Sequence, residues 1–492
     1  MGDTNILKED ILVIKRTEID MLSGSTLDEI GEAFSWRGRI FRRVYPHAEG
    51  YVKDLFTCGV LNELIEKDLF IPTWIARDVI FEDESILIEQ KKITPMIYSA
   101  EYSFLMRKEI ALTIIKINQV LFKYGFELMD PHYRNIAFDG CLPKYLDIGS
   151  IVKVDKFRTA FHGINCFEKN IYYPLLGYVR HKNMRPAMEA FLRCNGGIDD
   201  YGELGWIVHP VLGGCFRYFY VLRGLYRKSW PYMCGQSFGP NTSRIKKWVV
   251  KVAGIFLIPH NKDCAKQKKY LKIVSYQYKK YFKKIEGITI NIQERWSNYH
   301  DEYYDGKKLT KRQERIIDII NQLDCESCLE IAGNTGLMCR EMICRNSIKR
   351  AICTDYDSGA IDKGFELNRN SVNNGRLTFA VMNILDSCEY GKQSKAERMK
   401  SDVVLVMAVT HHLLLTQKVK LSRLVEIISQ YTKKFLLIEF MPRGLWTETI
   451  YVPTPEWYTL EWFEDELKIK FNILLVERLE KNRILLLCKV KE

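Results

Sequence analysis

Hydrophobic residues follow a strand-like pattern in some parts of the chain and a helical period in others. The changes between the two patterns predict how the chain is organised. Short runs such as residues 38–45 (GRIFRRVY) and 85–90 (SILIEQ) predict strands within the first hundred residues. A helical period then places apolar side chains on one face of residues 101–124. In the last third of the chain, apolar runs alternate with amphipathic stretches, as a doubly wound sheet covered by helices requires. We therefore expect an α/β domain at residues 306–492.

One stretch of this domain, residues 329–340, reads LEIAGNTGLMCR and predicts a strand, a tight loop and a helix start. Small side chains allow the loop backbone to approach a ligand closely. The pattern differs from the dinucleotide fingerprint G-x-G-x-x-G and resembles motif I of class I S-adenosylmethionine (SAM) methyltransferases, except that Ala332 stands where they often carry a first glycine. The resemblance implies a cradle for the methionine end of SAM. The residues expected to form it are Glu330, Ala332, Gly333, Asn334 and Gly336.

Polar residues also end the strands predicted next. Asp355 falls about one strand-helix-strand unit after the loop, where a carboxylate can accept both hydroxyls of a ribose. Asp357 is the alternative for this role. In the following strand, residues 378–386, Asn383 or Asp386 is placed to meet the adenine edge.

Two adjacent histidines, His411 and His412, end the fourth predicted strand, residues 402–416. An imidazole with an ordinary pKa near ~6.5 can take a hydroxyl proton at neutral pH, so this pair is predicted to hold the general base. The sequence does not distinguish which of the two histidines is the base. The fifth predicted strand ends near Glu439, and an open α/β sheet binds ligands at this edge.

A second informative stretch, residues 125–150, reads GFELMDPHYRNIAFDGCLPKYLDIGS. Asp130 precedes Asn135 by five positions, and Asp147 begins an Asp-x-Gly turn. In phosphotransferases such groups supply the catalytic base and two metal ligands. The stretch resembles the catalytic core of the protein-kinase-like and aminoglycoside-phosphotransferase-like families. The resemblance implies that Asp130 is catalytic and that Asn135 and Asp147 hold Mg²⁺ with ATP.

The sequence differs from the kinase pattern at several positions. Leu128 stands where those families place a histidine, and no glycine-rich G-x-G-x-x-G precedes the stretch. Lys53 and Lys91 are the candidates for a nucleotide-binding lysine. Two other interpretations stay open: an ordinary turn followed by a strand end, and a kinase-shaped domain that binds without catalysing.

The chain has 492 residues, enough for two or three domains, with 47% hydrophobic and 27% charged residues, as in globular proteins. Fourteen cysteines without a regular framework favour reduced, buried thiols. Burial also explains Cys325 and Cys328 better than a zinc site does. We find no secretion signal, and the apolar run 248–258 is too short to span a bilayer. These features predict a soluble, cytoplasmic protein.

The net charge of +12 is concentrated in residues 217–284, where aromatic residues are interleaved with lysine and arginine. Such a face fits an anionic surface, so we predict a place at the inner face of the membrane. A solvated helical face is the alternative, and nucleic acid is disfavoured because no reader motif accompanies the charge.

The motifs together resemble bacterial SAM-dependent methyltransferases related to the nodulation protein NoeA, which join a kinase-like segment to a methyltransferase. The resemblance implies a kinase-like α+β domain at residues 1–165, a helical, basic region at 166–305 and a class I methyltransferase at 306–492. It also implies methyl transfer to a glycan, a glycolipid or another small acceptor. A bifunctional kinase-methyltransferase acting on surface polysaccharide, and a non-catalytic pseudokinase or membrane-surface scaffold, are the alternatives.

Overall fold

The protein divides into two compact units, seen here in a computed structural model. The first unit comprises Met1–Lys92, Arg107–Ala137 and Pro143–Ile290; the second comprises Ile93–Met106, Phe138–Leu142 and Asn291–Glu492. The structure describes residues 11–22, 29–154, 161–181, 243–244, 247–248, 266–290, 309–386, 393–446 and 452–491. Most of the predicted basic stretch before residue 266 lies outside the described residues.

An antiparallel sheet of five strands, in the order β2-β3-β4-β7-β5, opens the first unit. Aromatic residues on one side of it, including Phe34 and Phe41, pack with Phe81 in a buried core. The strands are β2 (Asp20–Met21), β3 (Gly31–Trp36), β4 (Arg39–Val44), β5 (Thr73–Ile75) and β7 (Leu87–Gln90), and β1 (Leu12–Ile14) pairs separately with β6 (Val79–Phe81). Helices α1 (Glu49–Thr57) and α2 (Val60–Glu66) lie between β4 and β5 in sequence.

Helix α3 (Phe104–Lys123) confirms the helical period predicted for residues 101–124. Its residues Ile110, Ile114, Ile117 and Leu121 are completely buried. After it come β8 (Phe126–Leu128), the hairpin of β9 (Ile136–Asp139) and β10 (Leu142–Tyr145), and β11 (Ile151–Lys153), which pairs with β8. The helices that follow are α4 (His162–Phe167), the π-helix η7 (Glu168–Tyr172), α5 (Tyr173–His181) and α10 (Lys266–Glu286).

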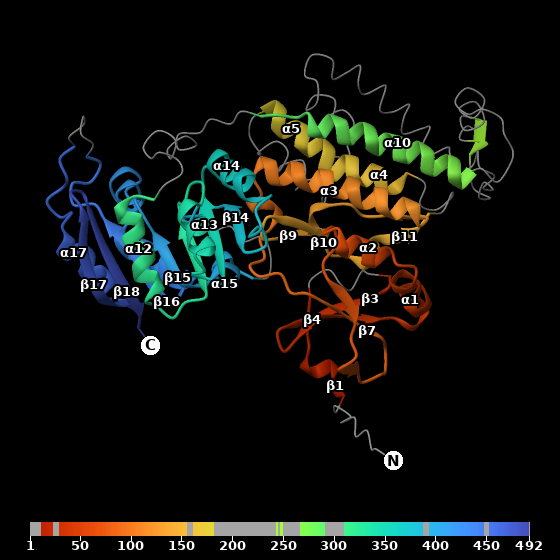
Figure 1. Cartoon of the computed structure of the whole chain (residues 1–492), viewed down its shortest axis with the longest axis horizontal. Coiled ribbons are helices and arrows are strands. Elements are labelled where there is room, and N and C mark those ends of the chain that lie inside the picture. Colours follow the sequence, from red (N-terminus) through yellow and green to blue (C-terminus); the bar gives the residue numbers. More distant parts are fainter. Residues whose placement is uncertain are drawn as a thin grey trace. The chain divides into compact units, whose positions relative to one another are not determined.

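Helix α10 carries part of the predicted basic face. Tyr270, Tyr278 and Tyr281 are buried on one side of it, and Tyr278 packs against Phe122 of α3 and Phe167 of α4. Figure 1 shows α10 running beside these helices. The exposed lysines lie on the other side: Lys272, Lys279, Lys280, Lys283 and Lys284. The helix is therefore amphipathic, with an aromatic face built into the first unit.

The second unit contains a seven-stranded sheet in the order β14-β13-β12-β15-β16-β18-β17, which confirms the predicted alternation of strands and helices. All neighbouring pairs are parallel except those made by β18. Figure 1 shows β14 and β17 at opposite ends of this sheet. The strands are β12 (Ser327–Ile331), β13 (Arg350–Asp355), β14 (Leu377–Val381), β15 (Ser401–Val406), β16 (Thr432–Phe440), β17 (Phe471–Glu480) and β18 (Arg483–Val490).

The chain runs outward from β12 to β13 and β14, and then returns to place β15 on the other side of β12. This reversal creates a switch point between β12 and β15, where open α/β sheets bind their ligands. The connecting helices are α12 (Lys311–Asn321), α13 (Leu337–Cys344), α14 (Ser358–Asn368), α15 (Lys395–Met399), α16 (Leu421–Tyr431) and α17 (Leu460–Leu467).

The fourth predicted strand, residues 402–416, is too long. Strand β15 ends at Val406, and His412–Thr416 form the π-helix η8. The strand stops because Ala408 takes a left-handed φ of 53°, and its N–H donates to the carboxylate of Glu439 instead of to a neighbouring strand.

Two short segments from the first half of the chain are part of the second unit. The N–H of Leu105 donates to the carboxylate of Asp362 (2.8 Å). In the other segment, the N–H of Cys141 donates to the carbonyl of Asn374 (2.6 Å). A side chain at Gly140 would come within 2.1 Å of that carbonyl, so only glycine fits. Residues of the second unit are thus hydrogen-bonded to segments that precede them by more than two hundred positions.

Among the described residues, none of the helices has both the length and the apolar character needed to cross a bilayer.

Candidate functional site

The loop after β12 has an unusual backbone. Ala332, Asn334 and Gly336 all take left-handed φ angles, of 56°, 53° and 69°. For Ala332 this conformation costs roughly 1–2 kcal/mol, a strain of the kind found at ligand sites. A Cβ at Gly333 would lie 2.8 Å from the Sγ of Cys353 and from two side-chain carbons of Glu330, so glycine is required there. The loop therefore presents bare backbone at the switch point.

Asp355, at the end of β13, is bound to this loop through both carboxylate oxygens. Oδ2 accepts the N–H of Asn334, and Oδ1 accepts the N–H of Asp357, each at 2.9 Å. Burial raises the pKa of Asp355 to about 6, while these hydrogen bonds oppose the rise. Asp357 caps α14 by accepting the N–H of Ala360, which leaves Asp355 as the better placed of the two acids.

Glu330, the acid before the loop, is also buried. Its Oε2 accepts a weak hydrogen bond from the thiol of Cys339 at 3.2 Å. Burial raises the pKa of Glu330 well above its ordinary value, since little water remains to solvate the ionised form. A cationic ligand group beside it would favour the carboxylate.

The two histidines lie beyond the end of β15, with ring centroids 4.1 Å apart. His411 is only 7% exposed, and its Nδ1 is buried without a hydrogen-bond partner in the described structure. Burial, together with the nearby His412 and Arg483, lowers the pKa of His411 to about 3. His411 is therefore neutral at physiological pH and can accept a proton or a hydrogen bond from a ligand.

A buried ion cluster that sequence reasoning missed stands at the same edge. Glu439 is fully buried and accepts hydrogen bonds from Arg312 Nη1 at 2.6 Å and Arg483 Nη1 at 3.0 Å. Arg312 comes from α12 and Arg483 from β18. Thr310 and Gln313 form a capping box that could have marked the start of α12. No local pattern, however, pairs an arginine with an acid 127 positions away.

One cavity of about 390 Å³, a size suited to a small-molecule ligand, is lined by Glu330, Asp355, the two histidines and the two arginines that bind Glu439. The structure brings together most of the predicted residues here, but Gly336 is not among the lining residues and supports the turn behind the loop. The predicted residues that line the cavity are Glu330, Ala332, Gly333, Asn334, Asp355, Asn383, His411 and His412. Those that sequence reasoning did not single out include Arg312, Gln313, Tyr356, Met382, Gln417 and Arg483.

Asp130 and Asn135, predicted for phosphoryl transfer, lie in the first unit. The Nδ2 of Asn135 donates to the backbone carbonyl of Asp130 at 3.0 Å and so fixes the loop between them. The Asp130 carboxylate lies 3.6 Å from the Nε2 of His162. This contact lowers the pKa of Asp130 and raises that of His162.

Asp147, the third of these residues, accepts a hydrogen bond from Arg42 Nη2 at 3.1 Å. Arg42 comes from β4, and burial lowers its pKa while the charge of Asp147 opposes the change. The sequence pointed instead to Lys53 and Lys91. Lys53 pairs with Glu49 on the exposed side of α1, whereas the contact to Asp147 comes from Arg42.

The cysteines near the loop are free thiols, and Cys328, Cys339 and Cys353 are buried. In the part of the chain that the structure describes, no group of three or more His, Cys, Asp or Glu residues is arranged to hold a metal ion.

Comparison with known proteins gives one relative of similar length. The chain is 22% identical to the nodulation protein NoeA of Rhizobium meliloti (strain 1021) over 445 residues, which cover 86% of this chain and 85% of NoeA. No protein-family model matches the sequence.

Two solved structures illustrate the matches to part of the chain. The N-methyltransferase NodS of Bradyrhizobium japonicum WM9 has a TM-score of 0.27 at 12% identity, covering 37% of this chain and 97% of NodS. A SAM-dependent methyltransferase of Clostridium acetobutylicum ATCC 824 has a TM-score of 0.31 at 15% identity, covering 40% of this chain and 98% of that protein.

Proposed function

We propose that the second unit is a SAM-dependent methyltransferase. The observation that carries the proposal is Asp355, a buried acid at the switch point whose two oxygens are fixed by the backbone of the glycine-bearing loop. The remaining lone pairs of such a carboxylate can accept the two hydroxyls of a ribose. The resemblance of residues 329–340 to motif I supports SAM as the cofactor, and the chain is similar to NoeA along most of its length.

The residues of the cavity fit the parts of SAM. Met382, Asn383 and Ile384 would meet the adenine, and Asp355 the ribose. The bare backbone at Gly333 would meet the methionine end, with Glu330 close to its positive charges. When bound, SAM supplies a methyl group that is electrophilic because it is attached to a sulfonium.

His411 is the residue best placed to act as general base. An acceptor hydroxyl would form a bond to the methyl carbon as the carbon–sulfur bond breaks, and the electron pair would leave with sulfur. The hydroxyl proton would pass to Nδ1 of His411, which is buried and has no partner in the described structure. A pKa of about 3 makes the His411 imidazole a weak base, so it would take the proton only as the new bond to the methyl carbon makes the hydroxyl strongly acidic.

As the acceptor we propose a glycan, a glycolipid or another small hydroxyl compound. The test is to incubate the protein with methyl-labelled SAM in extracts separated into glycan, lipid, protein and RNA fractions. Label in the glycan or lipid fraction supports the proposal, and its loss in Asp355→Ala assigns the activity to this site. Asp324→Asn, on a side chain that is 97% exposed, is the matched control. Label in RNA or protein alone would reject the acceptor class.

A second function, phosphoryl transfer by the first unit, is favoured by the buried Arg42 beside Asp147 and by the fixed loop from Asp130 to Asn135. In this proposal Asp147 and Asn135 would hold Mg²⁺ with ATP, and Asp130 would accept the proton of the attacking hydroxyl. Calorimetry with Mg-ATP tests it: binding that is lost in Asp147→Asn supports the role, and no binding to the unaltered protein rejects it.

A membrane-surface role for the basic stretch 217–284 is the remaining proposal, and α10 is the part of it that can be assessed. Lys279, Lys280, Lys283 and Lys284 are exposed on one side of this helix. Each lysine near an anionic bilayer contributes about 1 kcal/mol of attraction. Changing all four to glutamate should abolish binding to phosphatidylserine vesicles. Unchanged binding would reject the membrane role and indicate that these lysines only form a solvated helical face.

A further inference from the structure

Helix α15 carries two buried cationic side chains, and each pairs with a different acidic residue. Arg398 has a side-chain exposure of 0% and pairs with Glu101, which is 3% exposed. Lys395, one turn earlier, has an exposure of 5% and pairs with Asp386. A helix of five residues has little stability of its own, so its position depends on tertiary contacts, of which these two ion pairs are part.

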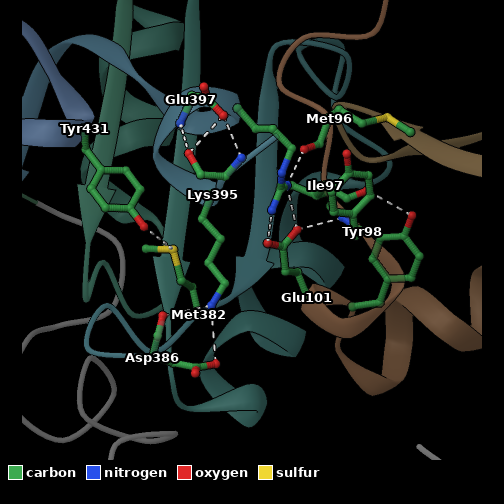
Figure 2. Close-up of polar contacts among 12 residues, drawn as sticks. Met96, Ile97, Tyr98, Glu101, Met382, Asp386, Lys395, Glu397 and Tyr431 are labelled. Carbon is green, nitrogen blue, oxygen red and sulfur yellow. Dashed lines mark hydrogen bonds and ion pairs between the residues drawn. The ribbon is translucent and has the colours of Figure 1, made fainter. Parts of the chain in front are cut away.

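The Arg398 guanidinium is held from several sides. Its Nη2 and Nη1 donate to the two carboxylate oxygens of Glu101 at 2.6 and 3.0 Å, and Nη1 also donates to the carbonyl of Met96 at 2.5 Å. The ring of Tyr98 lies 4.1 Å from the guanidinium carbon. Glu101 in turn accepts the N–H of Tyr98 at 2.6 Å, and Figure 2 shows this group of side chains. Such a bidentate pair fixes orientation as well as distance.

On its other side, α15 holds the turn that follows β14. The Lys395 ammonium donates to the backbone carbonyl of Asp386 at 3.1 Å and to its carboxylate at 3.3 Å. Figure 2 shows Lys395 reaching toward Asp386 below Met382. The N–H of Asp386 closes the turn on the carbonyl of Asn383, and the N–H of Met382 donates to the carbonyl of Asp355 at 2.8 Å. Met382 and Asn383 line the cofactor cavity.

We propose that the Glu101–Arg398 ion pair positions the cofactor-binding turn of residues 382–386 through α15. Glu101 is then a positioning residue for SAM, although in sequence it lies between β7 and α3. The inference rests on the proposed function, because SAM is the ligand that this turn would bind. It goes further in assigning part of the cofactor affinity to a residue from the first half of the chain.

A simpler role for the pair would be to attach the segment Ile93–Met106 to the second unit without any effect on the turn. The two roles predict different results when substitutions of Glu101 and Lys395 are combined. If Glu101 acts through α15, then cutting the link at Lys395 should remove its influence on SAM binding. Its influence on unfolding should persist, because the buried pair itself is still broken.

The experiment uses the full-length protein and its variants Glu101→Gln, Lys395→Met and the double variant. SAM affinity is measured by calorimetry, and the thermal midpoint without ligand by differential scanning fluorimetry. We expect each single variant to bind SAM roughly tenfold more weakly. This is the loss expected if the turn adopts its binding conformation in only about a tenth of the molecules. The double variant should bind no more weakly than Lys395→Met, yet unfold at a lower temperature than either single variant.

Glu314→Gln is the matched control, because Glu314 forms a bidentate pair with Arg345 in the same unit, but on an exposed surface. It should leave SAM affinity and the thermal midpoint unchanged. If Glu101→Gln fails to fold, Arg398→Lys keeps the charge and should show the same dependence on Lys395.

Unchanged SAM affinity in Glu101→Gln, or an additive loss in the double variant, would overturn the inference while leaving the methyltransferase proposal intact. Failure of the unaltered protein to bind SAM would instead reject the proposed cofactor, and the inference with it.

Discussion

Protonation of Asp355 should control how tightly the protein binds SAM. The carboxylate has a pKa of about 6, because burial disfavours its charge. Only the ionised form can accept hydrogen bonds from both ribose hydroxyls, since a protonated oxygen becomes a donor. Affinity should therefore be complete above pH 7 and fall as the pH drops through 6.

The size of the effect follows from the ionised fraction. For a pKa of about 6, roughly 0.9 of the sites are ionised at pH 7 and about 0.1 at pH 5, and the apparent affinity scales with this fraction. SAM should thus bind about tenfold more weakly at pH 5 than at pH 7. His411, with a pKa of about 3, contributes nothing to the change in this range.

The assay is calorimetric titration with SAM at pH 5, 6, 7 and 8, for the unaltered protein and for Asp355→Asn. The variant should bind weakly throughout, and the difference between the two profiles isolates Asp355 from other groups at the cavity, such as Glu330. Parallel profiles for the two proteins, or a flat profile for the unaltered one, would refute the assignment of the ribose to Asp355.

Three further changes test other parts of the site. Gly333→Ala should destabilise the protein by about 1–3 kcal/mol and weaken SAM binding, because its Cβ would lie 2.8 Å from Cys353 Sγ; an unchanged thermal midpoint would contradict this. His411→Asn should lower turnover by about 10²–10⁴-fold while SAM affinity stays constant, and a loss of affinity alone would exclude it as the base. Glu439→Gln should cost roughly 3–5 kcal/mol in urea unfolding, because it leaves buried arginine charge uncompensated; a loss below about 1 kcal/mol would show that water reaches the cluster.

Local sequence patterns predicted the five parallel strands of the second unit and the residues at their carboxyl ends, but not β17 and β18. Asp355 and His411 line the same cavity as Gly333 because parallel strands end at one edge of the sheet, which requires only the correct strand order. The end of β15 was predicted wrongly, since an apolar run such as residues 402–416 does not distinguish a strand from a following helical turn.

Long-range ion pairs could not be predicted in this way. Arg312 and Glu439 are separated by 127 positions, and Arg42 and Asp147 by 105. Arg312, Glu439 and Arg42 alone are ordinary charged positions in a helix or strand, and the motif around Asp147 does not indicate an arginine partner. Their partners depend on tertiary packing. The spacing of residues within one helix or strand does not predict such contacts. The same holds for Glu101, which begins the predicted helical stretch 101–124 and binds a residue 297 positions later.

The hairpin tip at Gly140 and Cys141 has a consequence for how the chain is made. Cys141 meets the carbonyl of Leu377 in the folded protein, 236 residues further along. A ribosome adding about 5–20 residues per second needs roughly 12–47 s to cover that distance. During synthesis the tip therefore emerges long before the strand that it packs against. Its close packing can form only after β14 has left the ribosome, so the first half of the chain must wait for the second before it is complete.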